Sequence, residues 1–226
     1  MPSNLSEMKR TRDGNVSSPE RLAYWYLRLN GFLLLENFVI HPDQGNDQRT
    51  DADLLGVRFA HRAENPVRPM ADDPVVTDCS TFCNVVIAEV KKGRCALNGP
   101  WTKPKEENIQ RVLCAIGCFP ESAVNLAAGE LYSTGLFTTE NVTCRLLAFG
   151  DHRAESLPIA AVPQILFNDM IRFIQRRFSN YIREKSSVGN WTWEGQELRH
   201  LAENNVEMGD FVKSVRALFG LGDHHQ

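Results

Sequence analysis

The sequence lacks any long run of apolar residues, since nowhere among its 226 residues do as many as 18 follow one another. A helix that crosses a bilayer needs roughly 18 or more such residues, so a membrane-spanning helix is excluded. The first 18 residues are polar and lack the apolar centre of a secretory signal peptide. We therefore expect a cytoplasmic protein with no membrane partner.

An excess of positive charge is also lacking. Lys and Arg total 25 residues against 28 Asp and Glu, which gives a formal net charge of −3. Overall charge therefore does not predict a polyanionic partner. Any role in nucleic-acid binding has to come from local basic patches.

The six cysteines form no regular framework. In a chain of this size they are more typical of reduced thiols than of disulfides. Two pairs are four residues apart, Cys79 with Cys83 and Cys114 with Cys118, but no histidine lies at a supporting spacing. Because cysteine is common in protein cores, structural zinc is not favoured.

The sequence is 42% hydrophobic and 23% charged, which is typical of a folded domain with one substantial core. Residues 1–18 are predicted to be a flexible tail. Residues 19–150 are expected to form the core, and residues 151–226 a helical C-terminal extension that packs on it.

The order of apolar patterns predicts an α/β fold. Ser17-Ser18-Pro19-Glu20 is a helix start and Gly31 a stop. The predicted strands are 32–40, 52–59, 84–91 and 142–149, and the predicted helices are 19–30, one from about residue 105, 121–132, 162–181 and 210–219. Short links favour an antiparallel arrangement of the first three strands, and the crossover helices allow the fourth to lie parallel to the third. The polar connection 61–82 is unusually long, which is typical of a functional or disordered loop.

Charged residues lie at the end of the most apolar strand, in Glu89-Val90-Lys91. Asp51 and Asp53 share a face of the preceding predicted strand. If the two strands pair, one carboxylate from each converges at the same end of the sheet. Two carboxylates and a backbone carbonyl suit Mg²⁺, and a nearby lysine can hold the attacking water. These are the groups needed to hydrolyse a phosphodiester.

The spacing Glu-x-Lys alone is weak, because Glu7-Met8-Lys9 in the polar tail has it too. Context separates the two occurrences. Only the second follows an apolar strand, with an Asp-bearing strand before it and a helix after it.

Glu20 on the first predicted helix, Asp53 in Thr-Asp-Ala-Asp-Leu-Leu-Gly-Val and Glu89-Val90-Lys91 together resemble the PD-(D/E)XK nuclease superfamily, in particular its Mrr and Holliday-junction-resolvase group. The resemblance covers roughly residues 19–150. It implies a restriction-endonuclease-like αβββαβ core with a mixed sheet, dependence on Mg²⁺ or Mn²⁺, and DNA as substrate.

The resemblance also implies residue roles. Asp53 and Glu89 would bind the metal together with the Val90 carbonyl, Lys91 would serve the nucleophilic water, and Glu20 would complete the shell. Gln110 resembles a polar position that supports the site, and the favoured alternative is a solvated helix residue. The sequence departs from the family pattern in three ways: no proline precedes Asp53, the connection 61–82 is long, and the C-terminal helices have no counterpart in the minimal core.

Other interpretations of these residues stay open. Glu20 can belong to a capping box with Ser17. Asp51 can replace Asp53, although Leu54-Leu55 directly after Asp53 favours the latter. Glu89 and Lys91 can be no more than an ion pair at a strand end.

Basic residues near the predicted site are candidates for binding phosphates, with Trp101 among them as a ring on which a base can stack. The alternative is a solvated rim, with Trp101 covering the edge of the core. The basic residues are Lys91, Lys92, Arg94, Lys103, Lys105 and Arg111. A second, weaker candidate surface lies toward the C-terminus, with Arg172, Arg176, Arg177, Arg183 and Lys185.

The sequence thus predicts a metal-dependent nuclease that acts on nucleic acid, with DNA favoured over RNA. The alternative is a catalytically silent nuclease fold that acts in nucleic-acid or protein binding. A homodimer, or a protein partner bound through the C-terminal helices, is compatible with either.

Overall fold

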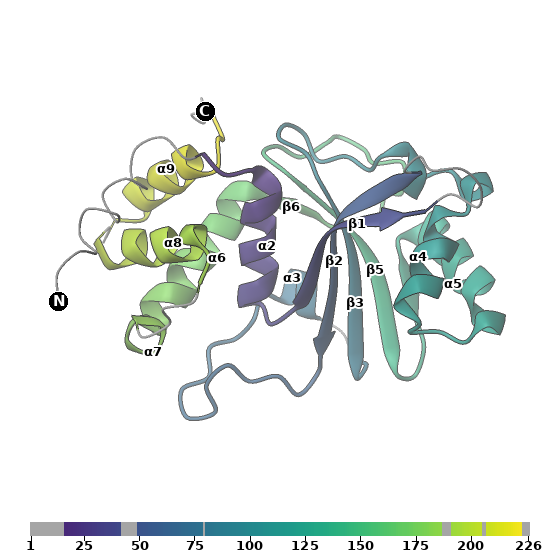
Figure 1. Cartoon of the computed structure of the whole chain (residues 1–226), viewed down its shortest axis with the longest axis horizontal. Helices are drawn as coiled ribbons and strands as arrows, with labels where there is room; N and C mark the ends of the chain where they lie inside the picture. Colours follow the sequence, from purple (N-terminus) through teal and green to yellow (C-terminus); the bar gives the residue numbers. More distant parts are fainter. Residues whose placement is uncertain (1–15, 42–48, 79, 187–190, 205–206, 223–226) are drawn as a thin grey trace.

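The computed structural model describes residues 16–41, 49–78, 80–186, 191–204 and 207–222 (Figure 1). Most of the predicted tail and of the turn before the second strand lies outside the described residues. In the part described, the chain forms six strands and eight α-helices, so the predicted α/β class is confirmed. No described helix is long and apolar enough to cross a membrane.

The sheet is mixed, as predicted. Its strands are β1 (Leu33–Ile40), β2 (Thr50–Phe59), β3 (Cys83–Val90), β4 (Leu136–Thr138), β5 (Val142–Gly150) and β6 (Gln164–Leu166). The order across the sheet is β1-β2-β3-β5-β4, and β6 pairs with β5. β1, β2 and β3 are antiparallel neighbours, whereas β5 runs parallel to β3. Both expectations for strand direction are confirmed.

Helices cover both faces of the sheet (Figure 1). One face packs against α2 (Pro19–Leu29) and α6 (Phe167–Asn180), beyond which lie α7 (Ile182–Ser186), α8 (Trp193–Asn204) and α9 (Met208–Leu218). The other face packs against α4 (Asn108–Ile116) and α5 (Glu121–Thr134). A short helix, α3 (Pro74–Thr77), and two 3₁₀ turns, η1 (Gly99–Trp101) and η2 (Pro104–Glu106), complete the elements.

Alternation along the strands divides the apolar residues between two cores. Val86 and Ala88 of β3 face α2 and α6, where they join a cluster with Leu22, Trp25 and Phe173. Val85 and Ile87 face the other way, into a cluster beneath α4 and α5. β3 is therefore covered on both faces, which explains its continuous apolar run.

The C-terminal helices pack on the core. Apolar residues of α6, α8 and α9 join the same cluster as α2, among them Phe173, Phe178, Leu198, Phe211 and Val215. These side chains are buried within the chain, so a partner that binds here would meet the polar faces of the helices.

Two predicted helix limits were wrong. The helix expected from about residue 105 begins at Asn108, because the chain first makes η1 and η2 around Pro100 and Pro104. The helix expected over 162–181 begins only at Phe167, because Gln164–Leu166 forms β6 beside β5.

The long connection after β2 is fastened to α6. Arg177, whose side chain is 0% exposed, forms ion pairs with Asp72 at 2.6 Å and Glu64 at 2.8 Å. It also donates hydrogen bonds to the Met70 and Ala71 carbonyls. Lys185 pairs with Glu64 as well. Arg177 and Lys185 are therefore buried structural groups, and the prediction that they belong to a basic surface was wrong.

Candidate active site at the ends of β2 and β3

The register of β2 and β3 brings the two predicted carboxylates to one end of the sheet. Leu55 lies opposite Ile87 and Leu54 opposite Ala88, and the next residues along the strands are Asp53 and Glu89. An oxygen of Asp53, Oδ2, accepts a hydrogen bond from the backbone N–H of Val90 at 2.7 Å. The Asp53 carboxylate is thus held against β3 directly beside Glu89.

Glu89 is a buried carboxylate, with a side chain that is 1% exposed. Its Oε2 accepts a hydrogen bond from the indole Nε1 of Trp101 at 2.7 Å. Its Oε1 accepts from the ammonium group of Lys91 and from the side-chain amide of Asn98. Three donors therefore meet one buried negative charge, which offsets the cost of removing that charge from water.

Burial raises the pKa of Glu89 above its ordinary value. Hydrogen bonds from Lys91 and Trp101 oppose this rise, and the negative charge of Asp53 adds to it. Burial likewise raises the pKa of Asp53, against the hydrogen bond from Val90 and the charge of Lys91. The two groups therefore hold their protons more tightly than free carboxylic acids do.

Glu20 belongs to the same group of acids. It lies in the first turn of α2, and its charge, with that of Asp51, contributes to the raised pKa of Asp53. The capping-box alternative for Glu20 was wrong: the N-cap is Ser18, without a side-chain capping bond, and Ser17 instead hydrogen-bonds Glu194.

Lys91 lies directly after β3, and its side chain is 33% exposed. Its backbone N–H donates to the Phe149 carbonyl of β5 at 3.0 Å, which fixes the start of the loop. The ammonium group is paired with Glu89 but keeps access to solvent. It is the one predicted site residue that combines a positive charge, contact with the carboxylates and partial exposure.

The remaining alternatives can be compared by position. Asp51 lies opposite Val39 of the edge strand β1, whereas Asp53 contacts β3. The Glu89–Lys91 pair is only partly exposed and is joined by Asn98 and Trp101. It is therefore more than an isolated surface ion pair.

The four predicted substrate contacts lie in different surroundings. Trp101 is 1% exposed and belongs to the core beneath α4 and α5, so the prediction that it stacks on a base was wrong and the alternative of a core position is confirmed. Gln110 and Arg111 of α4 line a groove toward β1. Lys92 is exposed beside Lys91.

Asn98 was missed by the sequence analysis. Its side-chain amide reaches Glu89 from the loop that leads into η1. The only signal in the sequence is the following Gly99-Pro100-Trp101, which indicates a turn but not the direction of the asparagine side chain.

The donor set at this end of the sheet fits a hard divalent cation. Within the described residues no group of three or more His, Cys, Asp or Glu side chains is placed to hold a metal. Asp53 and Glu89 nevertheless supply carboxylate oxygens beside the Val90 backbone, and only Oδ2 of Asp53 is engaged by Val90. Mg²⁺ commonly binds through one or two carboxylates and retains waters, so two carboxylates are enough. Burial and neighbouring acids raise the pKa of both carboxyl groups, which means that their ionised forms are disfavoured in the folded chain. A bound cation would offset this cost by neutralising the negative charge.

Comparisons with protein-family models, with curated proteins and with solved structures found no match to this chain.

Proposed function

We propose that the chain is a metal-dependent nuclease of the PD-(D/E)XK type that hydrolyses phosphodiester bonds in nucleic acid, with DNA as the substrate. One observation carries the proposal. The Asp53 carboxylate accepts a hydrogen bond from the backbone N–H of Val90, the residue after Glu89, and the ammonium group of Lys91 donates to the Glu89 carboxylate. The order α2, β1, β2, β3, α4–α5 and β5 agrees with the αβββαβ core expected of that superfamily.

Asp53, Glu89 and the Val90 carbonyl would hold Mg²⁺ or Mn²⁺, and Glu20 would complete the shell through water. When bound, such an ion stabilises charge on the phosphate oxygens and makes a coordinated water easier to deprotonate. The chain supplies the rest. Asn98 and Trp101 orient the Glu89 carboxylate, and Val90 orients that of Asp53.

Lys91 would position the attacking water, because its ammonium group lies at the carboxylates and is partly open to solvent. The water oxygen bonds to phosphorus while the bond from phosphorus to one sugar oxygen breaks. One proton leaves the water, and the released sugar oxygen takes up a proton from solvent. The positive charge of Lys91 also stabilises the additional negative charge on the phosphate in the transition state.

The proposal is tested with purified protein, supercoiled plasmid and Mg²⁺. Cleavage by the wild type and its loss in Lys91→Ala are expected, while Lys213→Ala should cleave normally. Lys213 is an exposed lysine of α9 and provides a matched control for loss of one charge. Equal cleavage by the wild type and Lys91→Ala would overturn the proposal, because it would identify a contaminant.

A second candidate is a catalytically silent nuclease fold that binds nucleic acid or protein. The observation in its favour is that both oxygens of Glu89 already accept hydrogen bonds, as in a structural buried carboxylate. Metal binding separates the two candidates. A nuclease site must gain stability from Mg²⁺ by mass action, and a silent module need not.

The proposal also includes a cytoplasmic location. Four cysteines within the described residues, Cys95, Cys114, Cys118 and Cys144, are free thiols, which agrees with a reducing compartment.

A further inference from the structure

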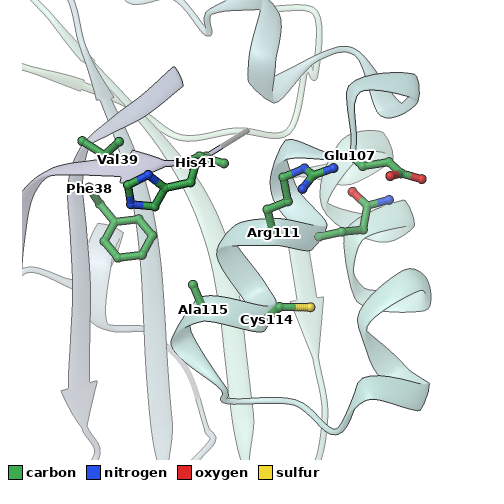
Figure 2. A pocket seen from close by; sticks show the side chains of 9 residues that line it. Phe38, Val39, His41, Glu107, Arg111, Cys114 and Ala115 are labelled. Atoms are coloured by element: carbon green, nitrogen blue, oxygen red, sulfur yellow. The ribbon is translucent and has the colours of Figure 1, made fainter. Parts of the chain in front are cut away.

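A groove runs between the edge strand β1 and helix α4 (Figure 2). Its volume is about 690 Å³, within the usual range for small-molecule sites. Phe38, Val39 and His41 line it from β1 and the residue after it, and Arg111, Cys114 and Ala115 line it from α4 (Figure 2). A second hollow of about 360 Å³, with mainly apolar walls, shares Phe38 and Ala115 with the first.

Both walls of the groove are tied to the elements that carry the carboxylates. On one side, Phe38 pairs with Ala52, the residue before Asp53. On the other, α4 begins at Asn108, whose side-chain amide donates to the Pro100 carbonyl next to Trp101. The walls of the groove are therefore connected to the elements that position Asp53 and Glu89.

Backbone strain is concentrated at the same place. Asn37 has φ of 48° and Glu107 has φ of 54°, and they are the two non-glycine residues with positive φ in the described part of the chain. Asn37 directly precedes Phe38, and Glu107 lines the groove as the N-cap of α4. Strained backbone of this kind is found preferentially at functional sites.

The lining offers a mixture of groups that suits a nucleotide. Phe38 and His41 present aromatic rings, and Arg111 carries a positive charge. The side-chain oxygen of Gln110 is buried and accepts no hydrogen bond from the described residues. A buried acceptor without a donor is unfavourable, and an N–H on the edge of a nucleobase would satisfy it. Arg111 is a cation that lines the groove, so it would bind the phosphate.

We propose that this groove holds one unpaired nucleotide of a single-stranded nucleic acid, with the base against Phe38 and Gln110 and the phosphate at Arg111. In duplex DNA the edge of each base is occupied by pairing and its faces by stacking. The groove should therefore bind an unpaired nucleotide in preference to a paired one. The inference rests on the proposed function and deepens it: the substrate has unpaired nucleotides next to the bond that is cut.

The test measures binding of the full chain to a fluorescent single-stranded oligonucleotide, and to the duplex of the same sequence, in EDTA so that no metal-dependent cleavage occurs. Ala115→Trp fills the groove from an exposed position on α4, and Leu126→Trp adds the same ring at an exposed position on α5. The single strand should bind more tightly than the duplex. Ala115→Trp should weaken its binding about tenfold, the effect of losing a stacked base, and Leu126→Trp should not.

Gln110→Leu distinguishes a ligand role from a structural one. The leucine keeps similar bulk but removes the acceptor, so single-strand affinity should fall while the melting temperature does not. A parallel fall in stability and affinity would assign Gln110 to the framework and overturn its part in the proposal.

Three outcomes are decisive. Tighter binding of duplex, unaffected by Ala115→Trp, overturns the inference and leaves the nuclease proposal standing, since cleavage is assayed separately. No binding of either nucleic acid also overturns the inference. In the third outcome, the wild type binds the single strand, Ala115→Trp does not, and neither cleaves DNA in Mg²⁺. That outcome supports nucleotide binding in the groove and overturns the proposed nuclease activity.

Discussion

The indole N–H of Trp101 donates to Oε2 of Glu89 across 2.7 Å, and both side chains are 1% exposed. A tryptophan in η1 thus stabilises the ionised form of a carboxylate at the end of β3. The hydrogen bond opposes the rise in the pKa of Glu89 that burial produces. The proposed metal ligand therefore depends on a residue that does not face solvent.

Trp101→Phe should raise the pKa of Glu89 further, because phenylalanine lacks the donor. Hydrogen bonds to charged groups contribute about 1.5–3 kcal/mol, so the acidic limb of the cleavage pH profile should move up by about one to two units. Trp25→Phe is the matched control, since Trp25 is also buried and its Nε1 meets no acceptor among the described residues. An identical acidic limb in the wild type and Trp101→Phe would contradict a role for the indole.

Asp53→Asn should stabilise the metal-free protein at neutral pH. Burial raises the pKa of Asp53 above its unfolded value, so the ionised form is disfavoured in the folded state. The stability that this group contributes is complete below its unfolded pKa, near 4, and is lost as the pH rises through the folded value.

The variant should therefore melt higher than the wild type at pH 8 in EDTA, and the difference should disappear as the pH falls below about 4. A gain of 1 kcal/mol corresponds to roughly 2–4 °C in a domain of this size. Asp210→Asn, at an exposed position of α9, is the control. A lower melting temperature for Asp53→Asn at pH 8 would show that the carboxylate stabilises the empty site.

Mg²⁺ should stabilise the wild type through the ionised carboxylates of Asp53 and Glu89. Cation binding neutralises Asp53 and Glu89, and a ligand present at 100 times its Kd stabilises a protein by about 2.7 kcal/mol. The melting temperature of the wild type should therefore rise by roughly 5–10 °C. Asp53→Asn and Glu89→Gln should show little or no rise. An equal rise in all three proteins would locate the binding elsewhere in the chain.

Much of the sheet could be predicted from the sequence because its signals are local. The apolar run of β3 and the alternation in the other strands are visible in single segments, and the short link between β1 and β2 favours antiparallel neighbours. Asp53 and Glu89 could be placed at the same end of the sheet only on the condition that β2 and β3 pair, because the long connection between them does not fix their register. Helical spacing over 162–181 was misleading, because Ile165 fits a helical pattern as well as the short strand beside β5.

Contacts between distant segments could not be predicted. The sequence around Trp101 is compatible with a surface ring and with a core residue. Only the fold of η1 directs its indole toward Glu89. Asn98 carries no local signal for its contact with the same carboxylate. Arg177 and Asp72 are 105 residues apart, and nothing in either segment indicates the other.

Arg177→Met should strongly destabilise the fold. The guanidinium lies between Asp72 and Glu64 in a buried cluster, and removing one partner of such a cluster leaves uncompensated charge. Losses of this kind are about 3–5 kcal/mol. Chemical denaturation should show the loss, and Arg172→Met, at an exposed position on the same helix, should lie within about 0.5 kcal/mol of the wild type.

The same variant should loosen the connection after β2, because Arg177 also binds the carbonyls of Met70 and Ala71. Limited proteolysis should then cut around residues 62–72 faster in Arg177→Met than in Arg172→Met. Equal cleavage rates, together with an unchanged free energy of unfolding, would mean that the remaining ion pairs of Asp72 with Arg58 and Arg62 hold the connection in place. In that case the ion pair with Arg58 of β2, and the pair with Arg62 inside the connection, would hold the loop without the contacts to α6.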